Sequence, residues 1–144
     1  MIVYAESSAV LAWLLGEPRS AFTQAALRDA ELVVTSMLTG AECSRAILRG
    51  AALGAIDRAR ARSLLDALAE WESGCDRMEM GDRVLDRTRA PFPHEPVRTL
   101  DAIHLASAAL ANTAIGAVSV LSLDDRVRTN AAAMGMELLP ASLR

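Results

Sequence analysis

Four carboxylates stand at places in the sequence from which they could converge on one site. Two of them follow β-prone runs, a third lies beside the apolar face of a predicted helix, and Asp101 lies in the first turn of an apolar helix within residues 98–108. The amide dipoles of that turn favour an anion. A lone Asp in a first turn usually only completes the cap and the dipole of its helix. A catalytic role for Asp101 therefore requires that the other acids converge on it. The four acids are Glu6, Glu42, Asp101 and Asp124.

Bringing these carboxylates together in a half-buried cleft is unfavourable, on the order of 4 kcal/mol per pair at roughly 4 Å and an effective dielectric constant of about 20. The chain contains no Lys, and no set of histidine partners is expected beside the acids. A hard divalent cation bound through oxygen atoms, Mg²⁺ or Mn²⁺, is therefore expected to balance them. Such ions position water and stabilise phosphoryl oxygens, so the sequence indicates phosphodiester hydrolysis.

The composition is that of one globular domain. The chain has 144 residues, of which 52% are hydrophobic and 23% charged, so we expect a single domain over residues 1–144 and no extensive disorder. Aromatic residues make up only 3%, which argues against base stacking as the main way of binding nucleic acid. A net charge of -3 gives no overall attraction to a polyanion. Arg replaces Lys throughout, which suits bidentate phosphate contacts but is explained more simply by the base composition of a genome.

The two cysteines and the N-terminal residues indicate the cellular compartment of the protein. Cys43 and Cys75 have no ligand spacing, so both are expected to be reduced and buried. The N-terminus lacks a basic region of the kind that opens a signal peptide, and the apolar run 9–15 is too short to span a bilayer. The sequence therefore predicts a cytoplasmic protein without a membrane partner.

Strand and helix signals alternate along the chain. Strands are expected at 2–5, 32–35, 75–80, 117–123 and 136–139, and helices at 9–15, 18–30, 37–53, 55–72, 81–89 and 126–134, with a further helix around Asp101 that Thr99 would cap. This order predicts an α/β fold with three layers, α/β/α, around a mainly parallel central sheet of four to five strands. Sites of such folds lie at the carboxyl ends of the strands, where the four acids could meet.

Four short segments occur in this order over nearly the whole chain. They read Y-A-E-S-S-A-V from Tyr4, A-E-C-S-R-A from Ala41, V-R-T-L-D-A-I-H-L-A from Val97 and L-S-L-D-D-R-V from Leu121. With these segments, the third being the most specific, the chain resembles the PIN-domain family and, within it, the VapC-like toxins of bacterial toxin-antitoxin pairs.

The resemblance implies a Mg²⁺- or Mn²⁺-dependent endoribonuclease, a PIN-like fold, a dimer, and inhibition by a VapB-like antitoxin whose tail enters the cleft. It implies catalytic roles for the four acids, with Glu6, Asp101 and Asp124 as metal ligands. The positions beside the first and last acids match small hydroxyl residues and an auxiliary acid; these are Ser8, Ser122 and Asp125.

Glu6 departs from the family pattern, because that position is normally Asp. The longer side chain is expected to relocate or weaken a bound metal ion. Since Glu6 follows a strand, we expect its side chain not to pack, so that replacing it changes the metal site and not the fold.

Residues around the acids have simpler interpretations. Arg98, Arg126 and Arg128 flank the acids and could steer RNA phosphates. His104 lies on an apolar helix, where a hydrogen-bonded core or rim histidine is expected rather than a base. Homodimerisation is expected through the apolar faces of the early helices, which include Trp13, Leu14 and Leu15.

Other functions also fit parts of this pattern. The change to Glu6 is compatible with a metal-poor PIN-fold binding module without turnover, and the motifs are compatible with a solitary PIN nuclease outside any toxin pair. A phosphoacceptor receiver domain or a haloacid-dehalogenase-like phosphatase would need a Lys beside the acids, which the chain lacks.

Overall fold

A five-stranded sheet in which all strands run parallel carries the structure, a computed structural model that describes residues 1–143. The strand order is β3-β2-β1-β4-β5, so β1 is central, with Val3 opposite Val33 on one side and Ser119 on the other. The strands are β1 (Ile2–Ala5), β2 (Leu32–Ser36), β3 (Asp76–Met78), β4 (Val118–Leu121) and β5 (Glu137–Leu139).

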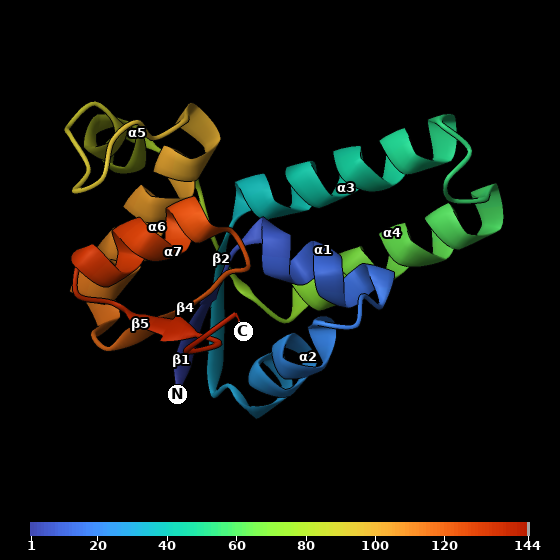
Figure 1. Ribbon diagram of the computed structural model, residues 1–144, viewed down its shortest axis with the longest axis horizontal. Coiled ribbons are helices and arrows are strands. Elements are labelled where there is room, and N and C mark those ends of the chain that lie inside the picture. Colours follow the sequence, from blue (N-terminus) through green and yellow to red (C-terminus); the bar gives the residue numbers. More distant parts are fainter. Residues whose placement is uncertain (144) are drawn as a thin grey trace.

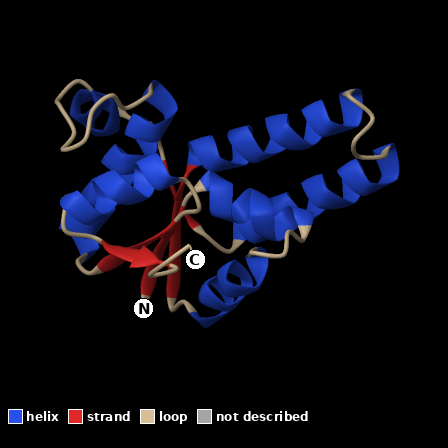
Figure 2. Ribbon diagram, in the orientation of Figure 1, coloured by secondary structure: helices blue, strands red, loops and turns tan. Residues whose placement is uncertain are grey.

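Helices cover both faces of this sheet (Figures 1 and 2). They are α1 (Ser7–Leu15), α2 (Ser20–Asp29), α3 (Met37–Ala52), α4 (Arg58–Ser73), α5 (Asp82–Thr88), α6 (Thr99–Ile115) and α7 (Asp125–Ala133). Helices α6 and α7 pack on one face, with α5 against α6, and α1, α2 and α4 pack on the other. The α3–α4 hairpin extends away from the sheet (Figure 1). The three-layer α/β/α fold is thus confirmed, with five strands that are parallel without exception.

The central strand β1 is buried on both faces. The side chains of Val3 and Ala5 lie on the face of the sheet covered by α1, α2 and α4. The side chain of Tyr4 lies on the other face, among residues of α6, β4 and α7. All three side chains are excluded from solvent. Because side chains alternate along a strand, Tyr4 is directed toward α6, the helix that also carries Asp101. None of the helices within residues 1–143 is long and apolar enough to cross a membrane.

The starts of α1 and α6, which both bear on the acids, differ from the sequence prediction. Helix α1 begins at Ser7, two residues early, because the side chain of Glu6 accepts a hydrogen bond from the Ser8 amide and caps it. Helix α6 begins at Thr99 itself, so Thr99 is not its cap; Arg98 occupies the cap position without a side-chain hydrogen bond. An Asp in the first turn still benefits from the helix dipole.

Arg128 has a structural role, and its prediction as an RNA-steering residue is wrong. The residue is only 6% exposed. Its guanidinium donates to the backbone carbonyls of Ser122 at 2.9 Å, Leu139 at 3.2 Å and Pro140 at 2.6 Å. It therefore joins the chain after β4 to the chain at the end of β5 through three backbone carbonyls.

We expect Arg128→Met to lower the free energy of unfolding by about 2 to 3 kcal/mol, because charge-assisted hydrogen bonds to buried carbonyls are lost. Arg126→Met, on the exposed face of the same helix, is the matched control and should change it by less than about 0.5 kcal/mol. Urea unfolding followed by circular dichroism measures both. Equal losses in the two variants would contradict the structural role of Arg128.

Candidate functional site

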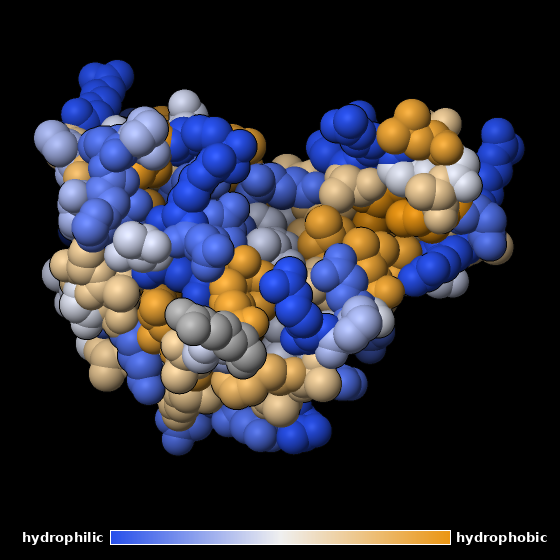
Figure 3. Space-filling view, viewed as in Figure 1, coloured by the Kyte–Doolittle hydropathy of each residue, from blue (hydrophilic) through white to orange (hydrophobic). Residues whose placement is uncertain are grey.

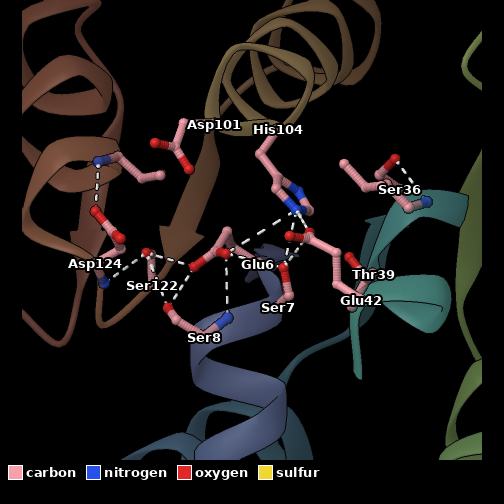
Figure 4. A network of polar contacts seen from close by, with 12 residues as sticks. Glu6, Ser7, Ser8, Ser36, Thr39, Glu42, Asp101, His104, Ser122 and Asp124 are labelled. Atoms are coloured by element: carbon pink, nitrogen blue, oxygen red, sulfur yellow. Dashed lines mark hydrogen bonds and ion pairs between the residues drawn. The ribbon is translucent and has the colours of Figure 1, made fainter. Parts of the chain in front are cut away.

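A hollow of about 270 Å³ opens at the carboxyl edge of the sheet, and all four predicted acids line it. Glu6 enters from the end of β1, Glu42 from α3, Asp101 from the first turn of α6, and Asp124 from the cap of α7. Figure 4 shows these side chains around a common centre. The remaining lining residues are Ser7, Ser8, Leu11, Cys43, Ala46 and Arg98.

Glu6 is the most firmly held of the four acids. It is 5% exposed. One carboxylate oxygen accepts from the Ser8 amide at 3.1 Å and lies 3.0 Å from the Ser7 hydroxyl, and the other accepts from the hydroxyls of Ser122, at 2.7 Å, and of Ser8. The expectation that this side chain does not pack is therefore wrong, because its length lets it reach a pocket of serine donors.

The two predicted hydroxyl residues also hold the loop after β4. The Ser8 hydroxyl accepts from the Leu123 amide at 2.9 Å, and the Ser122 hydroxyl accepts from the Asp124 amide at 3.1 Å. Each hydroxyl thus donates to Glu6 and accepts from the loop (Figure 4). The position of Asp124 is consequently tied to the carboxylate of Glu6.

Glu42 is held by a histidine that the sequence analysis did not place in the site. The Glu42 carboxylate oxygen Oε1 lies 2.6 Å from Nε2 of His104 and 2.6 Å from the hydroxyl of Ser7. On the other side of the ring, Nδ1 lies 2.9 Å from the Tyr4 hydroxyl. His104 is 1% exposed. It is the hydrogen-bonded core histidine that the sequence predicted, but it also stands beside an acid, contrary to our expectation.

A signal for this contact was present in the sequence. Asp101 and His104 are three residues apart on one helix, so both side chains lie on the same face. Ser7 and Tyr4 gave no comparable signal, because their contacts join segments about a hundred residues distant, as the separations of 97 and 100 residues from His104 show.

The hydrogen bonds to Glu42 decide its charge. Burial alone would raise the pKa of the Glu42 carboxyl, but the hydrogen bonds from His104 and Ser7 outweigh burial and leave the pKa below its usual value. Glu42 is therefore ionised at neutral pH.

Asp101 and Asp124 are held more loosely, each by partners near it in sequence. Asp101 forms an ion pair with Arg98 at 3.2 Å, whose side chain is mostly exposed. Asp124 caps α7 and accepts from the amides of Arg126 at 2.8 Å and Val127 at 3.3 Å. Both carboxylates remain accessible from the hollow.

The donor chemistry of the hollow fits a hard divalent cation, since its acidic side chains offer carboxylate oxygens. Within residues 1–143, however, no three His, Cys, Asp or Glu side chains are gathered closely enough to hold an ion. Binding an ion requires side-chain rotation, for which Asp101 needs to release only an exposed arginine. Glu6, by contrast, would have to give up buried hydrogen bonds from the Ser8 and Ser122 hydroxyls to bind an ion.

Three further residues are placed by the structure. Asp125 and Arg126 are exposed and line a separate hollow with His94, outside that of the four acids. Cys43 lines the acid hollow, but burial, reinforced by Glu42 and Glu6, raises the pKa of its thiol to about 12. The thiol stays protonated and is no nucleophile.

Comparison with known proteins agrees with the sequence motifs. A model of the PIN domain family matches residues 3–133. Ribonuclease VapC46 of Mycobacterium tuberculosis is 34% identical over 140 residues, covering 97% of this chain and 98% of that protein. Ribonuclease VapC35 of the same organism is 33% identical over 106 residues, covering 74% of this chain and 70% of that protein.

Two solved structures share the fold. The crystal structure of VapBC2 from Rickettsia felis, bound to a DNA fragment from the promoter, matches with a TM-score of 0.64 at 10% identity and covers 96% of this chain and 97% of that chain. The crystal structure of PAE2754 from Pyrobaculum aerophilum matches with a TM-score of 0.58 at 18% identity, with coverages of 96% and 84%. The match of the family model over residues 3–133 and the identity to VapC46 along almost the full length establish that this chain belongs to the PIN domain family.

Proposed function

We propose that this chain is a Mg²⁺- or Mn²⁺-dependent endoribonuclease that acts as the toxin of a toxin-antitoxin pair in the cytoplasm. The observation that carries the proposal is the convergence of four acids, from the end of β1, α3, α6 and the cap of α7, on one hollow. The names of two relatives, both ribonucleases, support RNA as the substrate.

We assign a different role to each group of residues in and near the hollow. Glu6, Asp101 and Asp124 would hold the ion, which when bound would activate water and stabilise charge on phosphoryl oxygens. Glu42, ionised and fixed by its hydrogen bonds, would orient a water by accepting a hydrogen bond from it. Arg98, at the mouth, and Arg126 contact RNA phosphates. Asp125 remains a candidate auxiliary acid only if RNA extends toward its separate hollow.

We further propose two protein partners, a VapB-like antitoxin and a second copy of the chain. VapBC2 from Rickettsia felis, which shares the fold of this chain, supports the first. Figure 3 shows apolar surface over α1 and the α3–α4 hairpin, which supports the second. Trp13, Leu14 and Leu15 are half-buried there, with Trp13 packed on Trp71 of the same chain.

A metal-poor binding module without turnover is the second candidate. Two observations favour it. Serine hydroxyls already donate hydrogen bonds to Glu6, and within residues 1–143 no three acidic side chains lie close enough together to hold an ion. Titration with Mn²⁺ separates the candidates, since a binding module takes up no ion and cleaves no RNA.

Asp101→Asn should abolish metal-dependent RNA cleavage, because it removes a proposed ligand charge while keeping the shape of the side chain. The free energy of unfolding should stay within about 1 kcal/mol of the wild-type value or rise, since the exposed ion pair to Arg98 contributes little and repulsion among the acids decreases. The measurement is cleavage of a total RNA pool with Mg²⁺, beside thermal unfolding.

The matched control is Asp82→Asn, which changes an acid in the first turn of α5, outside the acid hollow. This variant should cleave RNA at the wild-type rate. Wild-type activity of Asp101→Asn would show that the four-acid site is wrong.

Glu6→Asp should raise Mg²⁺ affinity and Mg²⁺-supported cleavage, because the shorter carboxylate leaves the serine pocket and stands back from the ion. The wild-type chain should bind Mg²⁺ weakly without RNA and be more active with Mn²⁺, which binds similar ligands more tightly. Losing hydrogen bonds to serines should also lower the free energy of unfolding by about 1 to 2 kcal/mol. Isothermal titration of both ions, cleavage assays and urea unfolding test this, and equal ion affinities in the two proteins would refute it.

The wild-type chain should scatter light as a dimer at micromolar concentration and moderate salt, because the apolar surface over α1 and the hairpin is otherwise left in water. A mass equal to one chain under these conditions would remove the dimer from the proposal.

A further inference from the structure

A line of hydrogen bonds runs from the core of the sheet to the acid hollow. It begins at the hydroxyl of Tyr4, passes through the ring of His104 at 2.9 Å, and ends on the Glu42 carboxylate at 2.6 Å. Tyr4 is fully buried and His104 is 1% exposed. In Figure 4 the ring of His104 points from α6 toward Glu42 and Ser7.

The number of protons available along this line of hydrogen bonds shows which nitrogen of the His104 ring donates to Glu42. An ionised carboxylate only accepts, so the two close neighbours of Glu42 Oε1, the Ser7 hydroxyl and His104 Nε2, both have to donate. The hydroxyl of Ser7 has one proton, and it cannot also supply the bond between Nε2 and Glu42. Nε2 must therefore carry a hydrogen of its own.

In a neutral ring with hydrogen on Nε2, the opposite nitrogen, Nδ1, is an acceptor. The Tyr4 hydroxyl is fully buried, lies 2.9 Å from Nδ1 and carries one proton. It can donate that proton to Nδ1 in a hydrogen bond, and every buried polar atom of the line has a partner. Donation from the tyrosine thus favours the same tautomer that the Glu42 carboxylate requires.

We propose that Tyr4 and His104 are positioning residues for Glu42: Tyr4 fixes His104 as the neutral tautomer with hydrogen on Nε2, and His104 holds the Glu42 carboxylate in the hollow. The consequence for cleavage rests on the proposed ribonuclease function, whereas the tautomer does not. Without this donor, Glu42, a partly exposed side chain on α3, would be held by the Ser7 hydroxyl alone and could turn toward solvent.

A pair of substitutions separates positioning from simple packing. The side-chain nitrogen of Gln reaches about as far as Nε2 of histidine, whereas that of Asn reaches about as far as Nδ1. His104→Gln should therefore keep a donor to Glu42 and retain cleavage within about threefold of wild type. His104→Asn should keep only the Tyr4 side of the line and lose kcat by roughly 10- to 100-fold, the usual cost of losing such an outer partner. KM for RNA should not change in either.

Binding of Mn²⁺, followed by electron paramagnetic resonance, gives a readout besides cleavage. Affinity should fall in His104→Asn, because the charge of Glu42 can then turn away from the ion proposed at Glu6, Asp101 and Asp124, and stay near the wild-type value in His104→Gln. His94→Asn, which changes the other histidine of the chain, outside the acid hollow, is the control and should leave the Mn²⁺ affinity unchanged. Equal behaviour of the Gln and Asn variants would mean that His104 only fills the core, and would overturn the proposal.

Nitrogen-15 NMR of the histidine rings decides the tautomer in the unaltered protein, and the His94→Asn variant assigns the two rings. At neutral pH, His104 should show one protonated nitrogen, Nε2, and one unprotonated nitrogen, Nδ1. Tyr4→Phe, which removes a single hydroxyl, should convert this pattern to a mixture of tautomers and lower kcat. Hydrogen on Nδ1 in the wild type, alone or together with Nε2, would overturn the proposal even if the variants failed to fold.

The same experiments distinguish this proposal from the proposed function. A wild-type chain that cleaves no RNA with either ion would contradict the ribonuclease, while the ring pattern would still decide the role of Tyr4. A chain that cleaves RNA with the other tautomer would keep the ribonuclease and contradict the positioning role.

Discussion

Repulsion among carboxylates at one edge of a parallel sheet is the constraint on which the rest of this structure depends. Glu6 and Glu42 approach the same hydroxyl, that of Ser7, at 3.0 Å and 2.6 Å. Such proximity is tolerable because hydroxyl, amide and imidazole groups donate to nearly every oxygen that the two carboxylates bury. A buried charge is costly unless it is hydrogen-bonded, so these donors are as much a part of the site as the acids.

The fold supplies these donors by bringing the ends of central strands together. Because β1 is the middle strand, Glu6 emerges between the turns that follow β2 and β4, and the serine after β4 reaches it directly. Behind that serine, Arg128 binds its carbonyl and those of Leu139 and Pro140, so the last strand helps to fix the loop that carries Asp124. The loop after β4 is thus held at the site by the hydroxyls of Ser8 and Ser122, and on its other side by Arg128.

The four acids fall into two kinds with different freedom. Glu6 and Glu42 are bound by residues far away in sequence, whereas Asp101 and Asp124 are bound by an exposed arginine and by the amides of their own helix. Rearranging the first pair would disturb buried hydrogen bonds, but rearranging the second pair would not. Adaptation of the hollow to an ion or a phosphate is therefore expected at the helix ends, where exposed interactions are weak.

The sequence by itself determined the order of strands and helices, the parallel sheet and the meeting of the four acids. Those features follow from local patterns, since buried strands are apolar runs and the ends of parallel strands share one edge. Tertiary structure alone decided that Arg128 is buried, that serines enclose Glu6, and that His104 connects Tyr4 to an acid of another helix. An arginine or a histidine has the same local signature in a core as on a surface. Its role depends on carbonyls, hydroxyls and carboxylates that only the folded chain brings within hydrogen-bond distance.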